Sequence, residues 1–200
     1  MLKLAKLAVT GGLSCGKSSA CRFFKELGAY IISADEIVHQ LLSSNTTLGQ
    51  QVIKLIGPDI VVNQQIDRSK IANKVFNQPQ LLKSLEVLLH PVVYKEIERR
   101  YQEVKNDPKI PLFVAEIPLL FESGGDSFFD YTVAVVADDS VCQQRFQLAT
   151  GLGPEEYAQR AARQLSPSEK ARRANFVIIN NNSPDQMRKE IEQIFQFLQY

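Results

Sequence analysis

Two glycines, a lysine and a serine near the start of the chain have the types and spacing that bind phosphate. Gly11 is followed, after four residues, by Gly16, Lys17 and Ser18, within VTGGLSCGKSSA at residues 9–20. Glycine adopts positive φ readily, so the backbone can fold back with successive N–H groups pointing inward. Lys17 would reach the β- and γ-phosphates of a nucleotide, and the Ser18 hydroxyl would bind Mg²⁺. The pattern therefore predicts a phosphate-binding loop.

The flanking segments have the periodicity that such a loop requires. The apolar run at 4–10 predicts a strand, and residues 17–28 predict an amphipathic helix that stops at Gly28. The apolar face of this helix consists of Ala20, Phe23, Phe24 and Leu27. The helix N-terminus would add to the anion site. The alternative is a glycine-rich turn that binds no ligand.

The rest of the chain alternates between short apolar runs and helical patterns. Further strands are predicted at 29–33, 110–117, 131–137 and 176–180. The longest helical pattern covers 79–104, where Pro91 predicts a break or kink. Ser166 and Ser183, each followed by proline, predict helix N-caps. These features predict an α/β fold in which helices cover both faces of a five-stranded parallel sheet.

Ligands in such folds gather at the carboxyl ends of the strands. Asp35 follows the second predicted strand, so we expect it to face the same crevice as Lys17. Its carboxylate could accept a proton from an attacking hydroxyl or help to hold Mg²⁺. A helical pattern at 36–42 follows, so a helix N-cap is the structural alternative for Asp35. The third, fourth and fifth strands are followed by Pro118 and Leu119, by Asp138 and Asp139, and by Asn180.

Residues 145–173 hold six basic residues against three glutamates, with glycine and proline between them. This composition predicts a mobile, helical, basic flap that covers a polyphosphate and excludes water. An exposed helical hairpin with a solvated basic face is the alternative for most of these arginines. Arg145 lies nearest to a predicted strand end and is the best candidate for a phosphate contact.

Composition favours a soluble, cytoplasmic enzyme. The chain has 200 residues, of which 44% are hydrophobic, and a formal net charge of +1, which predicts neither nucleic-acid nor membrane attraction. No apolar run approaches the length of a membrane span. Three cysteines without metal spacing predict reduced thiols. Cys15, inside the loop, is either an acidified, reactive thiol or a residue selected for its small size.

The order and spacing of several motifs resemble the dephospho-CoA kinase family nearly from end to end. The motifs are TGGLSCGKSS, ISADEIVHQLL, IDRSKIANKVF, LEVLLHPVV, IPLLFE, QQRF, GLGPEEYAQRAARQ and ANFVIINNN. The resemblance implies a P-loop, nucleotide-kinase-like fold and phosphorylation of the ribose 3′-hydroxyl of dephospho-CoA with ATP and Mg²⁺. It implies one kinase domain over 1–200. Its parts would be a core (about 1–35, 107–142 and 174–200), a helical substrate lobe (about 36–106) and a lid (about 143–173). Independently of the resemblance, we expect a monomer or a small homo-oligomer.

The resemblance also implies roles for individual residues. Asp35 would be the catalytic carboxylate, with Lys17 and Arg145 acting on the phosphates, and Ser18 and Asp35 would hold the metal. The ATP site would comprise Gly11, Gly12, Leu13, Ser14, Cys15, Gly16, Lys17, Ser18, Ser19 and Asn180. The acceptor site would comprise Thr10, Asp35, Arg68, His90, Pro118 and Leu119. For His90, a residue at a helix kink with a satisfied hydrogen bond is the alternative.

Three departures from the family pattern are visible. Ser33 stands where the family usually has a first aspartate before Asp35. Ala149 and Thr150 replace an Arg-Asp pair before the lid glycine, so Arg160 or Arg163 would have to supply the missing cation, or turnover would be slower. Ala174 is followed by Asn175 instead of aspartate.

Other classes of nucleotide-binding protein fit less well. A GTPase requires an N-K-x-D motif, and the nearest text, NKVF at 73–76, ends in phenylalanine. The signature of transporter ATPases is absent. Another P-loop small-molecule kinase remains the alternative, and a nucleotide-binding regulator without activity is a third class.

Overall fold

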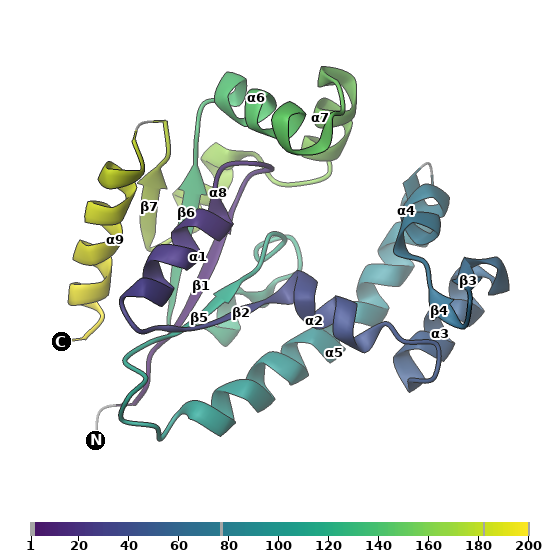
Figure 1. The fold of residues 1–200 in the computed structure, drawn as a ribbon, viewed down its shortest axis with the longest axis horizontal. Helices are drawn as coiled ribbons and strands as arrows, with labels where there is room; N and C mark the ends of the chain where they lie inside the picture. The colour runs from purple at the N-terminus through teal and green to yellow at the C-terminus, as the bar shows by residue number, and fades with distance from the viewer. Residues whose placement is uncertain (1–2, 77, 182, 200) are drawn as a thin grey trace. The chain divides into compact units, whose positions relative to one another are not determined.

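All five predicted strands are present and form one sheet (Figure 1). The structure, a computed structural model, describes residues 3–76, 78–181 and 183–199. The strand order is β2-β5-β1-β6-β7, and every neighbouring pair is parallel. The strands are β1 (Lys6–Gly11), β2 (Tyr30–Ser33), β5 (Phe113–Glu116), β6 (Tyr131–Val136) and β7 (Phe176–Ile179). The predicted α/β fold is therefore confirmed.

The central strand β1 shows why these segments form a sheet. Leu7, Ala8 and Val9 are consecutive and completely buried. Because successive side chains of a strand point to opposite faces, a continuous apolar run can be buried only where both faces are covered. β1 lies between β5 and β6, so the loop that follows Gly11 emerges at the middle of the carboxyl edge. This is the edge at which ligands of such sheets bind.

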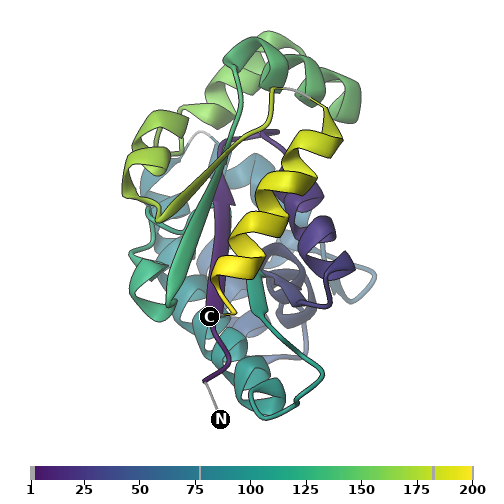
Figure 2. The same ribbon diagram turned by 90° about the vertical axis from the view of Figure 1, so that its left-hand side faces the viewer.

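Helices cover both faces of the sheet. Figure 2 shows α1 and α9 on one face and α8 on the other. The helices of this part of the chain are α1 (Lys17–Glu26), α6 (Asp139–Thr150), α7 (Pro154–Ala161), α8 (Pro167–Arg173), α9 (Pro184–Phe197) and the 3-10 helix η2 (Gly125–Phe128). Phe24, Phe146 and Ile191 are among the largest side chains that these helices bury.

The chain divides into two compact units, one made of residues 1–33 and 101–200 and the other of residues 34–100. The second unit is mainly helical and has its own apolar core, which includes Val52, Ile60 and Ile71. Its elements are α2 (Ala34–Leu41), α3 (Thr47–Ile56), the 3-10 helix η1 (Pro58–Ile60), β3 (Val61–Val62), β4 (Gln65–Ile66), α4 (Arg68–Phe76) and α5 (Pro79–Val104). The last four residues of α5 belong to the first unit.

Helix α5 runs without a break through Pro91, so of the predicted break or kink the break is wrong and the kink stays a prediction. Proline removes one hydrogen bond to the carbonyl four residues earlier, that of Val87. Pro91 is exposed and Val87 is 66% exposed, so water can take the place of the missing donor. Within the first unit, the hydroxyl of Tyr101, near the end of this helix, donates to the Leu4 carbonyl oxygen over 2.9 Å.

The sequence predicted a helix stop at Gly28 and N-caps at Ser166 and Ser183, and the structure has two of these three features as expected. Gly28 has a φ of 95° just after α1, as expected of a helix stop. The Ser166 hydroxyl caps α8 by accepting from the Glu169 N–H over 3.2 Å. Ser183 occupies the N-cap position of α9, but its side chain makes no capping bond. Within the described residues no helix is both long and apolar enough to cross a bilayer.

Candidate phosphate-binding site

The loop between β1 and α1 leaves the start of the helix open. Gly16 is the N-cap residue and has left-handed backbone angles, φ 101° and ψ 26°. Ser14 also has a positive φ, 57°. No side chain caps α1, although the first N–H groups of a helix have no acceptor within the helix. These groups and the positive end of the helix dipole are therefore available to an anion.

Two of the loop glycines are required by close neighbours. A Cβ atom on Gly11 would lie 2.1 Å from the Val135 carbonyl oxygen, because β1 and β6 pair at this point. A Cβ atom on Gly16 would lie 2.2 Å from Nδ2 of Asn180, and φ there is positive. No larger residue fits either position without moving backbone or a buried amide. The spacing of the motif is thus fixed by packing as well as by loop geometry.

Lys17 folds back onto the loop. Its Nζ donates to the carbonyl oxygens of Gly12 at 2.8 Å and Gly11 at 3.3 Å. The side chain is 9% exposed, and lysine is rarely this buried without partners. The ammonium group therefore lies beside the open end of α1, bonded to neutral carbonyls that a phosphate could replace.

Ser18 and Glu116 form a pair of oxygen ligands beside the loop. The Ser18 hydroxyl donates to Oε1 of Glu116 over 2.8 Å, and Ser18 is exposed. Glu116 is the last residue of β5, which neighbours β1 in the sheet. The sequence reasoning missed Glu116 because it treated the residue as part of an apolar strand. Its position as an acid within a strand that ends at the ligand-binding edge was the available signal.

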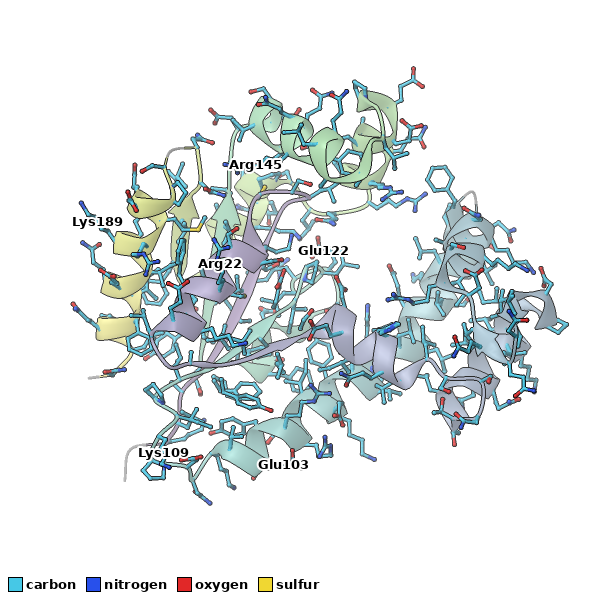
Figure 3. The ribbon with its side chains drawn as sticks, viewed as in Figure 1. Arg22, Glu103, Lys109, Glu122, Arg145 and Lys189 are labelled. Atoms are coloured by element: carbon cyan, nitrogen blue, oxygen red, sulfur yellow. The ribbon has the colours of Figure 1, made fainter. Side chains whose placement is uncertain are left out.

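Arg145, labelled in Figure 3, lies on α6 and has an unpaired hydrogen-bond donor among the described residues. Its Nη1 is buried and has no hydrogen-bond partner among the described residues. Buried guanidinium donors are normally satisfied, so an unpaired one indicates a missing acceptor. A phosphate oxygen is well suited to this role because arginine binds phosphates through charge-assisted hydrogen bonds.

Two thiols meet beneath the loop. Sγ of Cys15 lies 3.1 Å from Sγ of Cys142 on α6, and both cysteines are free and buried. The hydrogen bond from Cys142, with a smaller contribution from the Lys17 charge, lowers the pKa of Cys15. The same bond and burial raise the pKa of Cys142. Cys15 thus has the acidified character considered from the sequence, but its side chain is 0% exposed.

The remaining candidates in the first unit lie around the loop. Thr10 is completely buried and donates to the Pro118 carbonyl oxygen over 3.1 Å. Asn180 is buried and its Nδ2 donates to the Cys15 carbonyl oxygen over 2.8 Å. Pro118 and Leu119 directly follow Ile117 at the end of β5 and are half-buried. Thr10, Asn180 and Pro118 therefore contribute to the hydrogen bonds that shape the loop and its surroundings.

Three candidates belong to the second unit. Asp35 is exposed and is the second residue of α2, so it lies in the first turn of the helix and is not its N-cap. Arg68 is exposed at the start of α4, just after Asp67, whose carboxylate accepts from the N–H groups of Ser69 and Lys70. His90 is half-buried on α5, and burial lowers its pKa against the opposing charge of Glu86.

Comparison with known proteins gives the family of this chain. The family model described as "Dephospho-CoA kinase" matches residues 5–186. A curated dephospho-CoA kinase of Protochlamydia amoebophila is 50% identical over 199 residues, covering 99% of this chain and 98% of the relative. The chain belongs to the dephospho-CoA kinase family.

Solved structures agree with this family assignment. A dephospho-CoA kinase from Campylobacter jejuni is similar at 26% identity and a TM-score of 0.62, with 97% of each chain covered. A Thermus thermophilus protein named TT1252 is 27% identical with a TM-score of 0.83, and 98% of each chain is covered. The sheet that carries the loop is therefore the sheet of P-loop kinases.

One further buried charge near the loop of this family member was not anticipated from the sequence. Lys170, on α8, is completely buried and forms an ion pair of 3.0 Å with Glu122. The sequence reasoning counted Lys170 as one cation of a basic flap. No apolar stripe within PSEKARR marks Lys170, and its partner Glu122 is distant in sequence, so its burial could not be inferred.

Proposed function

We propose that this protein transfers the γ-phosphoryl group of ATP to the ribose 3′-hydroxyl of dephospho-CoA, which yields coenzyme A. The observation that carries the proposal is the open N-terminus of α1, with Lys17 beside it and an unpaired buried donor on Arg145. These groups are the parts that phosphoryl transfer requires, because the reaction depends on positioning and on charge stabilisation. Membership of the dephospho-CoA kinase family supplies the acceptor.

The residues of the first unit would bind and orient the triphosphate. Backbone N–H groups of the loop and the start of α1 hold the phosphate oxygens. Lys17 exchanges the Gly11 and Gly12 carbonyls for the β- and γ-phosphates, and Arg145 neutralises charge that develops on the transferred group. Asn180 donates a hydrogen bond to the Cys15 carbonyl and so would hold the loop beside the adenosine site.

Asp35 would act on the acceptor. A ribose hydroxyl is a poor nucleophile at neutral pH, and a carboxylate within hydrogen-bond reach can take its proton as the phosphoryl group departs. Asp35 is exposed and therefore accessible to such a hydroxyl. Arg68 and His90, within a substrate lobe over about 36–106, would bind the rest of the acceptor together with Pro118 and Leu119 of the core. A lid over about 143–173 would exclude water. His90, whose pKa burial lowers, would be neutral and able both to donate and to accept.

The residues beside the loop fit a magnesium ion. Mg²⁺ prefers oxygen ligands and is held by one or two protein groups together with substrate phosphates. The Ser18 hydroxyl and the Glu116 carboxylate lie 2.8 Å apart and provide such oxygens, and Asp35 is the third candidate. When bound, the ion would neutralise charge on the β- and γ-phosphates. The described residues hold no group of three or more His, Cys, Asp or Glu side chains that could bind a metal alone.

Three further features remain predictions. We expect a cytoplasmic protein, as the three free cysteines suggest, without affinity for nucleic acid or membranes. We expect a monomer or a small homo-oligomer. Size-exclusion chromatography with light scattering would measure the oligomeric state.

A coupled assay of ADP release tests the proposed function. With ATP and Mg²⁺, dephospho-CoA should support turnover, whereas adenosine, other nucleosides and nucleoside monophosphates should not. Mass spectrometry should identify the product as coenzyme A, which is dephospho-CoA with one phosphate added at the ribose 3′-oxygen. Thermal unfolding gives a first indication, because a bound substrate stabilises the folded state. Turnover with a nucleoside but not with dephospho-CoA would overturn the proposal in favour of another small-molecule kinase.

A further inference from the structure

Lys170 is a charged side chain that the phosphate-transfer residues described so far leave unexplained. It lies on α8 and its side chain is 0% exposed. A lysine is almost never fully buried unless it is paired, because an isolated ammonium loses its hydration. The ammonium group is within hydrogen-bond distance of the Pro118 carbonyl at 2.6 Å, the Gly11 carbonyl at 3.3 Å, Oε1 of Glu122 at 3.0 Å and Oε1 of Gln164 at 3.5 Å.

These acceptors bring together three parts of the chain. Gly11 ends β1, Pro118 follows the neighbouring strand β5, and Gln164 precedes α8. A single ammonium group thus connects the ends of two adjacent strands to the helix on the opposite face of the sheet from α1 (Figure 2). In the same region, a Cβ atom on Gly12 would lie 3.1 Å from Cγ of Pro167, so α8 also packs directly against the phosphate loop.

Glu122, labelled in Figure 3, depends on Lys170 for its charge balance. Its Oε1 also accepts from the Leu165 N–H over 2.8 Å. Its Oε2 is buried and has no hydrogen-bond partner in the described parts of the chain. Burial lowers the pKa of Lys170, and the hydrogen bond and charge of Glu122 oppose that change. Removal of either partner would leave a buried charge uncompensated.

The Gly11 carbonyl is shared by two lysines. Lys17 and Lys170 each approach its oxygen to 3.3 Å. Lys17 must release this oxygen in order to reach a nucleotide phosphate. A buried carbonyl that loses its only donor is costly, but a carbonyl has two acceptor sites, and Lys170 remains on the second. With Lys170 in place, the departure of Lys17 does not leave Gly11 unpaired.

We propose that Lys170 is a positioning residue that keeps the Gly11 carbonyl hydrogen-bonded and so allows Lys17 to turn from the loop to the phosphates of ATP. It acts through Lys17 and the loop and does not itself contact the reacting atoms. The inference rests on the proposed binding of ATP by the loop. It predicts that Lys170 and Lys17 are energetically coupled in nucleotide binding.

The test is a double-mutant cycle that measures the Kd for ATP by calorimetry. Lys170→Met keeps the length of the side chain and removes the charge and the donors. In the wild-type background we expect this variant to weaken ATP binding and to reduce kcat/KM for ATP by roughly 10²-fold, as for a small displacement of a catalytic group. In a Lys17→Met background, where no ammonium has to be released, Lys170→Met should change the Kd for ATP little. Equal losses in both backgrounds would overturn the proposal.

Two matched variants separate this role from a general loss of stability. Ile191→Ala, in the buried core on α9, is expected to destabilise the fold while leaving the Kd for ATP and kcat of the folded protein unchanged. Lys189→Met makes the same chemical change on the exposed surface of α9 (Figure 3) and should alter neither quantity. If Ile191→Ala weakened ATP binding as much as Lys170→Met, stability alone would explain the effect.

If Lys170→Met does not fold, Glu122→Gln gives the same test with a smaller change. Glu122→Gln leaves the Lys170 ammonium in place but removes the carboxylate charge that holds it. The Kd for ATP should therefore rise less than in Lys170→Met, and this rise should again require Lys17. An effect independent of Lys17 would contradict the proposal. These measurements need no acceptor, so a wild-type protein that fails to phosphorylate dephospho-CoA would overturn the proposed function and leave the coupling between Lys17 and Lys170 testable.

Discussion

Helices α1 and α3 both begin with N–H groups that have no acceptor within the helix, but only α3 has a side chain that caps them. At α3 the Thr46 hydroxyl accepts from the Gly49 N–H over 3.0 Å, which closes the end of the helix. At α1 the N-cap is Gly16, which has no side chain, and the end stays open. A capped end stabilises the fold of the free protein, whereas an open end reserves its donors for a ligand. The comparison suggests that stability and catalysis depend on separate helix ends in this protein.

The largest effect is expected at the open end. Lys17→Ala removes the ammonium group beside α1, which stabilises charge on the transferred group, so kcat should fall by about 10³-fold. The free energy of unfolding should change little, because the Lys17 ammonium bonds to two loop carbonyls among the described residues of the free protein. ADP-release kinetics and urea unfolding measure the two quantities. Near-normal turnover in a folded Lys17→Ala protein would contradict the kinase mechanism.

Asp35→Asn should have the next largest effect. Asp35 lies in the first turn of α2, where an acidic residue also stabilises a helix through its dipole. The substitution keeps the size of the side chain but removes its charge and basicity, so kcat should fall by about 10²-fold or more while KM for ATP changes less.

The response to Mg²⁺ distinguishes the possible roles of Asp35. If the carboxylate mainly holds the metal, raising the Mg²⁺ concentration should restore part of the activity. If it is the base, additional Mg²⁺ should have no effect. If the variant had normal kcat and slightly lower stability, Asp35 would only stabilise helix α2 and would have no catalytic role.

Thr46→Ala tests the closed end. Loss of the cap should lower the free energy of unfolding by about 1 kcal/mol, as for other threonine caps. Turnover of the folded protein should remain at the wild-type level, since the bonds of the Thr46 hydroxyl in the described part of the chain go to backbone groups of Leu41, Ser43 and Gly49. Urea unfolding and ADP-release kinetics provide the readouts. A large loss of kcat would break the proposed separation between stabilising and catalytic helix ends.

The smallest expected effect is the contribution of His90 to the pH dependence of the free energy of unfolding. Burial lowers its pKa, so the unfolded chain takes up a proton at a higher pH than the folded protein does. Stability should therefore be lost as the pH falls below the ordinary histidine value of about 6.5 and through the folded pKa. His90→Gln should remove this contribution. Urea unfolding from neutral to acidic pH should find a shallower decline for the variant than for the wild type, and parallel curves would contradict the assignment.

Much of the fold could be predicted because its signals are local. The five strands were recognised from continuous apolar runs, and Gly28 and Ser166 marked helix ends through their own backbone preferences. The break at Pro91 was wrong because the cost of proline in a helix depends on whether water can reach the released carbonyl. The short hairpin of β3 and β4 was not predicted. Its turn has positive φ at Asn63 and Gln64, and glutamine carries no preference for this conformation.

The candidate site was less predictable than the fold. The phosphate loop was recognisable because its residues are contiguous, and Asp35 could be proposed because it follows a strand end. Lys170, Glu116 and the contact between Cys15 and Cys142 could not be found in the same way. Each acts through a partner that only the tertiary fold brings near, as Ser18 and Glu116, 98 positions apart, illustrate.

The bond between Asn180 and the Cys15 carbonyl also has a consequence for how the protein is made. It joins residues 165 positions apart, and the contact between Lys170 and Gly11 spans 159 positions. During synthesis the phosphate loop leaves the ribosome 159 to 165 residues before the groups that fix its shape. Contacts of such long range form slowly because loop closure must precede them. A nascent chain should therefore acquire affinity for nucleotide late and abruptly, when the last strand joins the sheet.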